Sequence, residues 1–364
     1  MRLALLAFLL LATAARAEPA ALDKTLATAM EARAVPALGV LTMRDFKVEA
    51  VAVRGVRRLG ATAPVTADDR WHLGSDGKAM TATMIARLVD RGVLSWTTPL
   101  SQMLPDLAAG MQPDYRDVTL LDLLSHRAGL GEMDDKDPAF QAAYADARPT
   151  PQQHGDWVKR FLGAPSAGPK RAAMKYSNQG FITAAYIAER ATGKPYAQLM
   201  REEVFAPLGM KSPRLGPPGG GELSGHVGGK PETAQDANPA FVDPAGGWRM
   251  TLSDWAVFCL DQMEGERGRG RLLKPASYKM LHTPQGDTVA ALGWGAPAKA
   301  AGRQGPALTH SGSDGAWYAL VLLFPGRGNG VLVTANAADD MGGDKAATAV
   351  IHVVAEGLAP AAAP

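Results

Sequence analysis

A serine and a lysine three positions apart are the residues of this chain best suited to chemistry. Ser75 and Lys78 stand at the start of residues 75–91, whose apolar spacing predicts a helix. One helical turn brings both side chains to the same face, within hydrogen-bonding reach of each other. A serine hydroxyl becomes a nucleophile when a neighbouring base accepts its proton, and a desolvated lysine can be that base. The helix N-terminus would add N–H groups that suit a developing oxyanion.

Two further segments, far away in the sequence, carry groups that could serve the same reaction. Tyr176 has a phenol that can shuttle a proton, and Asn178 has a donor and an acceptor for a substrate amide. The third segment contains His310, Ser311 and Gly312, just before a β-prone run. Its imidazole or hydroxyl could hold a substrate carboxylate, its glycine permits close backbone approach, and one of its N–H groups could be a second oxyanion donor.

Each segment alone also has a purely structural interpretation. Ser75 could be only a helix cap, Tyr176 an anchored loop tyrosine, and His310 a hydrogen-bonded strand histidine. The joint order of the segments favours chemistry. Ser-x-x-Lys, then Tyr-x-Asn about a hundred residues later, then His-Ser-Gly near the C-terminal strands closely resembles the superfamily of class C β-lactamases, D-alanyl-D-alanine carboxypeptidases and serine esterases.

Supporting segments extend this resemblance over roughly the whole chain after residue 17; they are residues 123–130, 206–210, 245–247 and 293–295. The resemblance implies that Ser75 attacks a carbonyl and becomes acylated, while Lys78 and Tyr176 share the general-base and general-acid work. Which of the two holds the proton at each step stays open. It also implies that Asn178 contacts the substrate amide and helps to fix Lys78.

The same resemblance assigns substrate binding to the third segment. His310, Ser311, Gly312 and Ser313 would contact the substrate, and the backbone N–H groups of Ser75 and Ser313 would form the oxyanion hole. β-Lactamases typically carry Lys-Thr-Gly at this place, where this chain has His-Ser-Gly. An imidazole is mostly neutral at pH 7, so a permanent cation for a drug carboxylate is missing. We therefore do not expect strong β-lactamase activity.

The pattern of elements predicts an α+β fold. Two strands, 38–43 and 48–53, form an N-terminal hairpin, and two more, 316–324 and 330–336, form a C-terminal one. Helices are expected between and after them, at residues 75–91, 120–125, 152–162, 180–191, 196–205, 253–262 and 346–356. We expect a mainly antiparallel sheet built from N- and C-terminal segments, flanked by helices, with a helical lobe from the middle of the chain, as in β-lactamases and transpeptidases.

The expected boundaries follow from this arrangement. A signal peptide covers residues 1–17, because a short positive start and an apolar run precede Ala15-Arg16-Ala17, and residues 359–364 form a flexible tail. Residues 18–358 then form one serine-hydrolase unit, with an α/β lobe at about 18–75 and 248–358 and a helical lobe at about 76–247. The Gly- and Pro-rich residues 216–247 either line a site or are a surface excursion.

Charge and composition limit the partners. The chain has 38 Lys and Arg against 36 Asp and Glu, and removal of residues 1–17 takes away two arginines. The nearly equal numbers of basic and acidic residues that remain argue against nucleic acid as a ligand. After residue 17, no apolar run is long enough to hold the mature chain in a membrane. The histidine and cysteine patterns indicate no metal site, and no nucleotide-binding loop occurs. The single Cys259 is expected to be a buried, inert thiol, and His72 and His126 to be structural.

Together these observations predict a periplasmic or secreted serine hydrolase without metal or organic cofactor. It would cleave an amide or ester of a small molecule or peptide, such as a β-lactam, a D-amino-acid peptide or a carboxylic ester, through an acyl-serine. One alternative is a D-alanyl-D-alanine carboxypeptidase. Another is a catalytically silent protein that binds a peptide or cell-wall fragment, although such a protein has no use for a nucleophile with its base. The oligomeric state stays open.

Gly77 weakens the first helical turn by up to ~1 kcal/mol relative to Ala, and we expect it to permit close packing.

Overall fold

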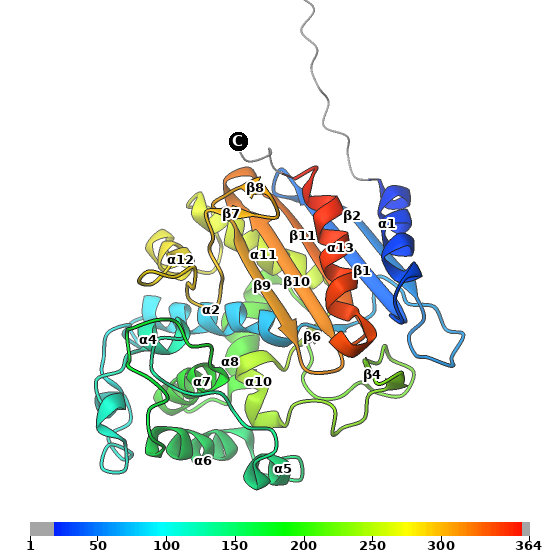
Figure 1. Cartoon of the computed structure of the whole chain (residues 1–364). Helices are drawn as coiled ribbons and strands as arrows, with labels where there is room; N and C mark the ends of the chain where they lie inside the picture. Colours follow the sequence, from blue (N-terminus) through cyan, green and yellow to red (C-terminus); the bar gives the residue numbers. More distant parts are fainter. Residues whose placement is uncertain (1–17, 359–364) are drawn as a thin grey trace, which may run out of the picture.

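The computed structural model describes residues 18–358 and is organised around a five-stranded sheet (Figure 1). The predicted signal peptide at 1–17 and the predicted tail at 359–364 lie outside the described residues. Strand order is β2-β1-β11-β10-β9, and all neighbours are antiparallel. The strands are β1 (Ala37–Arg44), β2 (Lys47–Gly55), β9 (Leu308–Ser313), β10 (Tyr318–Phe324) and β11 (Asn329–Ala335). The first and last parts of the chain therefore share one sheet, which confirms the predicted fold class.

Alternation along the strands gives the sheet two buried faces. Leu38 and Val40 of β1 pack with the helices α1 (Pro19–Glu31) and α13 (Gly343–Ala355), which cover one face (Figure 1). Leu41 and Met43 point to the opposite face, where α11 (Leu252–Glu266) packs. Side chains of a strand alternate between faces, so a strand buried on both sides is apolar at nearly every position. This explains the continuous apolar runs from which these strands were predicted.

The middle of the chain supplies most of the remaining helices, on one side of the sheet in Figure 1. They are α2 (Gly77–Asp90), α3 (Leu100–Met103), α4 (Leu120–Leu124), α5 (Pro138–Ala143), α6 (Thr150–Gly163), α7 (Asn178–Thr192), α8 (Tyr196–Met200), α9 (Ala206–Leu208), α10 (Asp243–Gly246) and α12 (Pro275–His282). Short 3-10 or π turns are η1 (Gly74–Asp76), η2 (Pro113–Tyr115), η3 (Arg201–Phe205), η4 (Ala240–Val242), η5 (Pro325–Arg327) and η6 (Asp339–Met341). Two-residue strands are β3 (Trp71–His72), β4 (His226–Val227), β5 (Lys230–Pro231), β6 (Arg249–Met250), β7 (Lys299–Ala300) and β8 (Arg303–Gln304).

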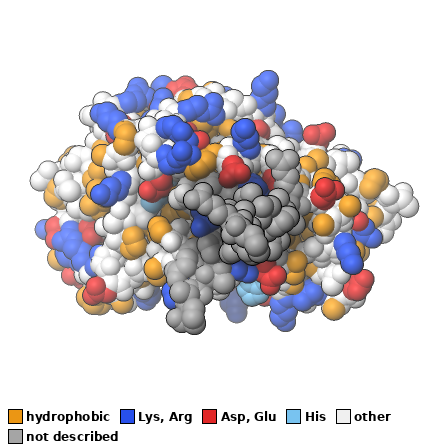
Figure 2. Space-filling model, turned by 90° about the horizontal axis from the view of Figure 1, so that it is seen from above, with side chains coloured by type: hydrophobic (Ala, Val, Ile, Leu, Met, Phe, Trp, Pro, Cys, Tyr) orange, Lys and Arg blue, Asp and Glu red, His pale blue; other side chains and the backbone are white. Residues whose placement is uncertain are grey.

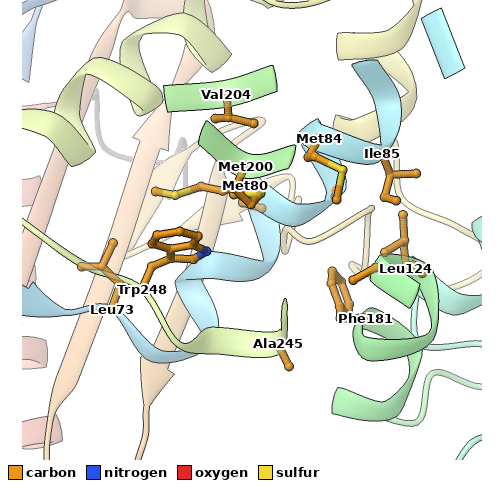
Figure 3. Close-up of a cluster of buried hydrophobic side chains, with 14 of the residues drawn as sticks. Leu73, Met80, Met84, Ile85, Leu124, Phe181, Met200, Val204, Ala245 and Trp248 are labelled. Carbon is orange, nitrogen blue, oxygen red and sulfur yellow. The ribbon is translucent and has the colours of Figure 1, made fainter. Parts of the chain in front are cut away.

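The helix predicted at 75–91 is α2, and its surroundings differ from those expected. It begins after the 3-10 turn η1 and ends before Gly92, which has a left-handed φ of 74°. Residues 77–86 are buried on every side of the helix. Met80, Met84 and Ile85 lie among apolar side chains of other segments, including Phe181 (Figure 3). The helix that follows Ser75 is thus a central core helix, which holds its first turn in a fixed position.

Several helices were not predicted from the sequence, and the role predicted for Gly77 is wrong. Helices α1, α5 and α12 were not predicted, and the helix expected at 196–205 ends in the π turn η3. Gly77 does not serve close packing, because a Cβ there would lie 3.6 Å from Gly246 Cα, an ordinary van der Waals distance. The loop at 216–247 contains β4, β5, η4 and α10 and lines a cavity. The loop therefore borders a cavity, and whether that cavity is a site stays a prediction.

The surface carries mixed charge. On the face drawn in Figure 2, Lys and Arg side chains lie interspersed with Asp and Glu around the described part of the surface. Among residues 18–358, no helix is both long enough and apolar enough to cross a bilayer.

Candidate active site

The first two predicted segments meet at the side chain of Ser75. Lys78 Nζ donates a hydrogen bond to Ser75 Oγ at 2.8 Å, and the Tyr176 hydroxyl donates to the same oxygen at 2.7 Å. Tyr176 is 101 residues away in sequence, so the contact arises from the fold. An alcohol, an amine and a phenol thus meet at one oxygen. These are the groups that acyl transfer through a serine requires.

Backbone segments from the two halves of the sheet region touch beside this nucleophile. Gly312 on the edge strand β9 lies against the turn η1: a Cβ at Gly312 would lie 2.0 Å from the Leu73 carbonyl oxygen and 2.7 Å from Ser75 N. A Cβ at Gly74 would lie 2.4 Å from Ser313 N. Only glycine permits such a distance, and Gly74 also has a left-handed φ of 50°. The third predicted segment therefore also lies at the site, and the amides of Ser75 and Ser313 belong to touching stretches of chain.

Lys78 is fully buried, and this changes its chemistry. Its side chain is 0% exposed, its Nζ also donates to the Ala245 carbonyl at 2.6 Å, and the Tyr176 ring centroid is 4.9 Å away. Burial lowers the pKa of Lys78 well below its usual range, and the carboxyl of Asp76 opposes this shift. This shift favours the neutral amine, which is the form that can accept a proton.

Asp76 is a residue of this site that sequence reasoning missed. It is 2% exposed, and neither carboxyl oxygen has a hydrogen-bond partner among the described residues. One oxygen lies 3.9 Å from His310 Nδ1. Burial raises the pKa of Asp76 well above its usual range, with an opposing effect of Lys78. The available signal was an acidic residue directly after the nucleophile, in a turn that leads into an apolar helix.

Tyr176 is positioned by a histidine from the segment that follows α4. The ring of His126 stacks on the ring of Tyr176 with 4.4 Å between centroids, and His126 Nδ1 accepts a hydrogen bond from Ser177 N at 3.1 Å. Burial, chiefly, lowers the pKa of His126 to about 3. Burial also raises the pKa of Tyr176 to about 12, opposed by its hydrogen bond to Ser75. The phenol therefore keeps its proton near neutral pH and can donate it, while His126 has the structural role expected for it.

Asn178 lies two residues after Tyr176, but it does not make the hydrogen bond to Lys78 that was expected. It is the first residue of α7, and its Oδ1 is buried without a hydrogen-bond partner among residues 18–358. The described hydrogen bonds of Lys78 Nζ go to Ser75 and Ala245 instead. Ala245 belongs to α10, at the end of the 216–247 loop, so this loop rather than Asn178 fixes the amine. The unpaired Oδ1 is free to accept a hydrogen bond.

A cavity of about 350 Å³ borders Tyr176 and is lined also by Trp294, His310 and Ser311; we call it the His310 cavity. His310 Nδ1 lies 2.8 Å from the Ser311 carbonyl oxygen, to which an Nδ1–H donates. Burial, chiefly, lowers the pKa of His310 to about 4. The imidazole is therefore neutral at pH 7, and the Ser311 side chain beside it is uncharged. Ser313 Oγ accepts a hydrogen bond from Gly315 N at 3.1 Å.

The remaining candidate groups are accounted for by packing. Cys259 is 0% exposed, and burial raises the pKa of its thiol, so the predicted buried position is confirmed. His72 Nδ1 accepts a hydrogen bond from Gly74 N at 3.0 Å, which agrees with a structural role. Among residues 18–358, no group of three or more His, Cys, Asp or Glu is arranged to hold a metal ion.

Comparisons with known proteins place this chain in a family. The Beta-lactamase family model matches residues 22–356. The Unguisins hydrolase ungD' of Aspergillus campestris is 34% identical over 157 residues, which are 42% of this chain and 28% of that protein. The chain thus spans under a third of that hydrolase. Penicillin-binding protein 4 of Amycolatopsis lactamdurans is 28% identical over 295 residues, or 75% of this chain and 74% of that protein.

Among solved structures, the D-alanine carboxypeptidase AmpC from Burkholderia cenocepacia superposes with a TM-score of 0.71 at 23% identity. The alignment covers 91% of this chain and 99% of that one. This likeness shows a shared fold. The family match extends over nearly all described residues, from α1 to the end of α13. The chain belongs to the Beta-lactamase family.

Proposed function

We propose that this protein is a serine hydrolase that cleaves an amide or ester bond of a small molecule or peptide through an acyl intermediate on Ser75. The observation that carries the proposal is the double hydrogen bond at Ser75 Oγ, from Lys78 Nζ at 2.8 Å and from the Tyr176 hydroxyl at 2.7 Å. Names of relatives agree with it, because they include a hydrolase and a penicillin-binding protein. A protein that only binds a ligand has no use for this arrangement.

In the proposed reaction, Lys78 is the base and Tyr176 the acid. The neutral amine of Lys78 takes the proton of Ser75 as Oγ forms a bond to the substrate carbonyl carbon. Tyr176, whose pKa is raised to about 12, gives its proton to the leaving amine or alcohol as the carbon–heteroatom bond breaks. The phenolate then regains a proton from the Lys78 ammonium. Water attacks the acyl-serine by the reverse sequence and releases the acid.

The backbone N–H groups of Ser75 and Ser313 are assigned to stabilise the negative charge that develops on the substrate carbonyl oxygen. Their two chain segments touch at Gly74 and Gly312, so both N–H groups can point at one carbonyl oxygen. Loss of one oxyanion donor typically costs about 3 kcal/mol of transition-state stabilisation. Asn178 Oδ1, buried and without a described partner, is assigned to a substrate amide N–H. His310 and Ser311 line the cavity for the adjoining substrate group.

The second candidate within this class is a D-alanyl-D-alanine carboxypeptidase. Similarity to a penicillin-binding protein over three quarters of this chain favours it. The neutral His310 counts against efficient hydrolysis of β-lactams, because it offers a drug carboxylate no fixed positive charge. We further propose that the chain is exported after removal of residues 1–17 and acts in the periplasm or outside the cell.

Labelling with a fluorophosphonate, followed by mass spectrometry of the digest, tests the proposal. We expect one adduct, on Ser75, and no adduct in Ser75→Ala. An adduct elsewhere, or equal turnover of p-nitrophenyl esters by wild type and Ser75→Ala, contradicts the proposal and favours the binding protein. Nitrocefin hydrolysis and D-alanine release from a D-Ala-D-Ala peptide then separate the β-lactamase from the carboxypeptidase.

A further inference from the structure

A second cavity, of about 220 Å³, borders the nucleophile segment on the side of the 216–247 loop. We call it the acidic annex; the lining residues used below are His72, Glu232, Asp243, Arg249 and Asp314. None of these side chains takes part in the proposed acyl transfer. The cavity is large enough for a substrate side chain or terminus but smaller than a typical pocket for a whole drug-sized ligand. It therefore suits one group of a larger substrate.

The annex adjoins the proposed oxyanion hole through three backbone connections. Asp314 directly follows Ser313, and His72 accepts the hydrogen bond of Gly74 N. A Cβ at Gly246, the residue before the lining residue Gly247, would lie 2.7 Å from the Gly74 carbonyl oxygen. The walls of the annex and the backbone that holds Ser75 are thus the same stretches of chain. A group bound in the annex can belong to the molecule whose carbonyl lies at Ser75.

Arg249 is a buried cation that lines the annex, and its described hydrogen bonds go to groups other than the annex carboxyls. Arg249 donates to the carbonyl oxygens of Gly216 at 2.9 Å and Pro217 at 2.8 Å, and its Nη1 lies 3.5 Å from Glu222. The carboxylate of Asp146, which also lines the cavity, is paired with Arg148 at 2.7 Å. The charge of Arg249 acts on the nearby carboxyls of Glu232 and Asp314. Glu232, Asp243 and Asp314 nevertheless accept no hydrogen bond from Arg249 among the described contacts.

Asp243 is the carboxyl of the annex with the fewest described partners. It lines the annex and is partly exposed, and no described residue donates a hydrogen bond to its side chain. Burial alone raises its pKa to about 8. A Cβ at Gly247 would lie 2.2 Å from Asp243 Oδ1, so the backbone leaves room for this carboxyl. A desolvated carboxylate without a donor binds a charged donor strongly, because it gains both charge attraction and hydrogen bonds.

Asp314 gives a second, independent observation: one of its buried carboxyl oxygens has no hydrogen-bond donor. Its side chain is 0% exposed, Oδ1 accepts from Ala316 N at 3.1 Å, and Oδ2 has no hydrogen bond among the described residues. The atom facing Oδ2, at 3.3 Å, is His72 Nδ1, which already accepts from Gly74 N. Two acceptors therefore face each other. Glu232 adds a third carboxyl, whose oxygens accept from Gly225 N and Trp317 Nε1.

We propose that the acidic annex binds a primary ammonium group of the substrate, with Asp243 as its acceptor and Asp314 and Glu232 adding to the negative potential. This inference rests on the proposed hydrolase function and specifies its substrate class: amides or esters that carry an amine near the scissile carbonyl. The ammonium belongs either to a free α-amine or to a basic side chain, and the chemistry of recognition is the same for both.

Binding of n-butylammonium, with 1-butanol as the neutral probe, tests the annex without any turnover. In ligand-observed NMR at pH 9, where Asp243 with its pKa of about 8 is ionised, we expect wild type to bind the ammonium at least tenfold more tightly than the alcohol. Asp243→Asn abolishes this preference, and Asp68→Asn, which removes an exposed carboxylate outside both cavities, keeps it. Equal affinity of wild type for the two probes overturns the proposal, whatever the variants do. Ser75 labelling is unaffected by that result, so failure of the annex and failure of the hydrolase function are distinguishable.

Three p-nitroanilides identify the source of the ammonium. These are D-alanine p-nitroanilide, its N-acetyl form, and N-acetyl-D-lysine p-nitroanilide. We expect at least tenfold higher kcat/KM for one amine-bearing substrate than for N-acetyl-D-alanine p-nitroanilide, and loss of this ratio in Asp243→Asn. A preference for the first substrate identifies an α-amine, and one for the third a side-chain amine. Equal kcat/KM for all three in wild type contradicts the inference.

Discussion

The His310 cavity and the acidic annex border the same nucleophile segment but differ in charge and in origin. The His310 cavity is lined by an imidazole with a pKa of about 4, a serine and a tryptophan, and is neutral near pH 7. The annex is lined by three carboxyls that accept no described hydrogen bond from its arginine. Strand β9 supplies His310 and Ser311, whereas the 216–247 loop supplies Glu232 and Asp243.

This difference suggests separate roles: groups at the His310 cavity would take part in the reaction, and groups of the annex would select the substrate. Tyr176, which lines the His310 cavity, touches the Ser75 oxygen directly. The side chains of the annex contact the backbone around the nucleophile but not its oxygen. A rigid sheet edge can hold reacting groups in place, while a loop can change its side chains without disturbing them. We therefore expect substitutions on the two sides to alter different kinetic quantities.

The largest effect is expected for Tyr176→Phe. The phenylalanine keeps the stack on His126 but has no proton to donate to the leaving group. General-acid catalysis contributes about 10²–10⁴-fold, so kcat for an amide substrate should fall by that factor. An ester with a p-nitrophenolate leaving group needs less protonation and should lose less. Rate measurements on a matched amide and ester check this, and an equal loss for both would mean that Tyr176 only positions Ser75.

A smaller effect, on kcat/KM, is expected when a positive charge is introduced into the His310 cavity. His310→Lys places an ammonium where the imidazole is uncharged at pH 7. A charge-assisted hydrogen bond to a substrate carboxylate is worth about 1.5 kcal/mol, or about tenfold in kcat/KM. We expect this gain for nitrocefin, which carries a carboxylate, and no gain in His310→Gln. A similar rise in both variants would show that the size of the side chain, and not its charge, limits the cavity.

The pH dependence of n-butylammonium binding should distinguish the two cavities. Asp243 has a pKa of about 8 and Asp314 of about 7, both raised by burial, so their carboxylates form as the pH rises from 7 to 9. Burial also raises the pKa of Glu232 above its usual value, while His72, with a pKa of about 4, stays neutral in this range. The probe itself remains an ammonium, since alkylamines titrate near pH 10.

We therefore expect about tenfold tighter binding at pH 9 than at pH 7, because the ionised fraction of a group with pKa 8 rises about tenfold between these values. NMR titrations at both pH values measure it. A flat profile would place the probe in the His310 cavity, whose histidine does not titrate in this range. Asp243→Asn should reduce the pH dependence, and Asp68→Asn should leave it intact.

The sequence predicts the two sides of the site unequally, for physical reasons. Ser75, Lys78 and Tyr176 were singled out because the order of their segments resembles a known superfamily. The strands β1, β10 and β11 are recognisable because burial on both faces makes them apolar. Asp243 and Asp314 were missed because an acid is exposed in most loops, and only tertiary packing removes water from these two. The contact expected between Asn178 and Lys78 failed for a similar reason: the Ala245 carbonyl, placed by the loop, takes that position.

The smallest effect concerns two glycines beside the nucleophile. Gly77 has helical φ and ψ of −60° and −21°, and a Cβ there would lie 3.7 Å from Trp248 Cδ1 and no closer to Gly246 than ordinary contact. Gly77→Ala should therefore raise the free energy of unfolding by up to ~1 kcal/mol, since alanine loses less backbone entropy in a helix. Gly312→Ala should lower it, because its Cβ would lie 2.0 Å from the Leu73 carbonyl oxygen. Urea unfolding measures both, and a loss of stability in Gly77→Ala would mean that the added Cβ does not fit at the first turn of α2.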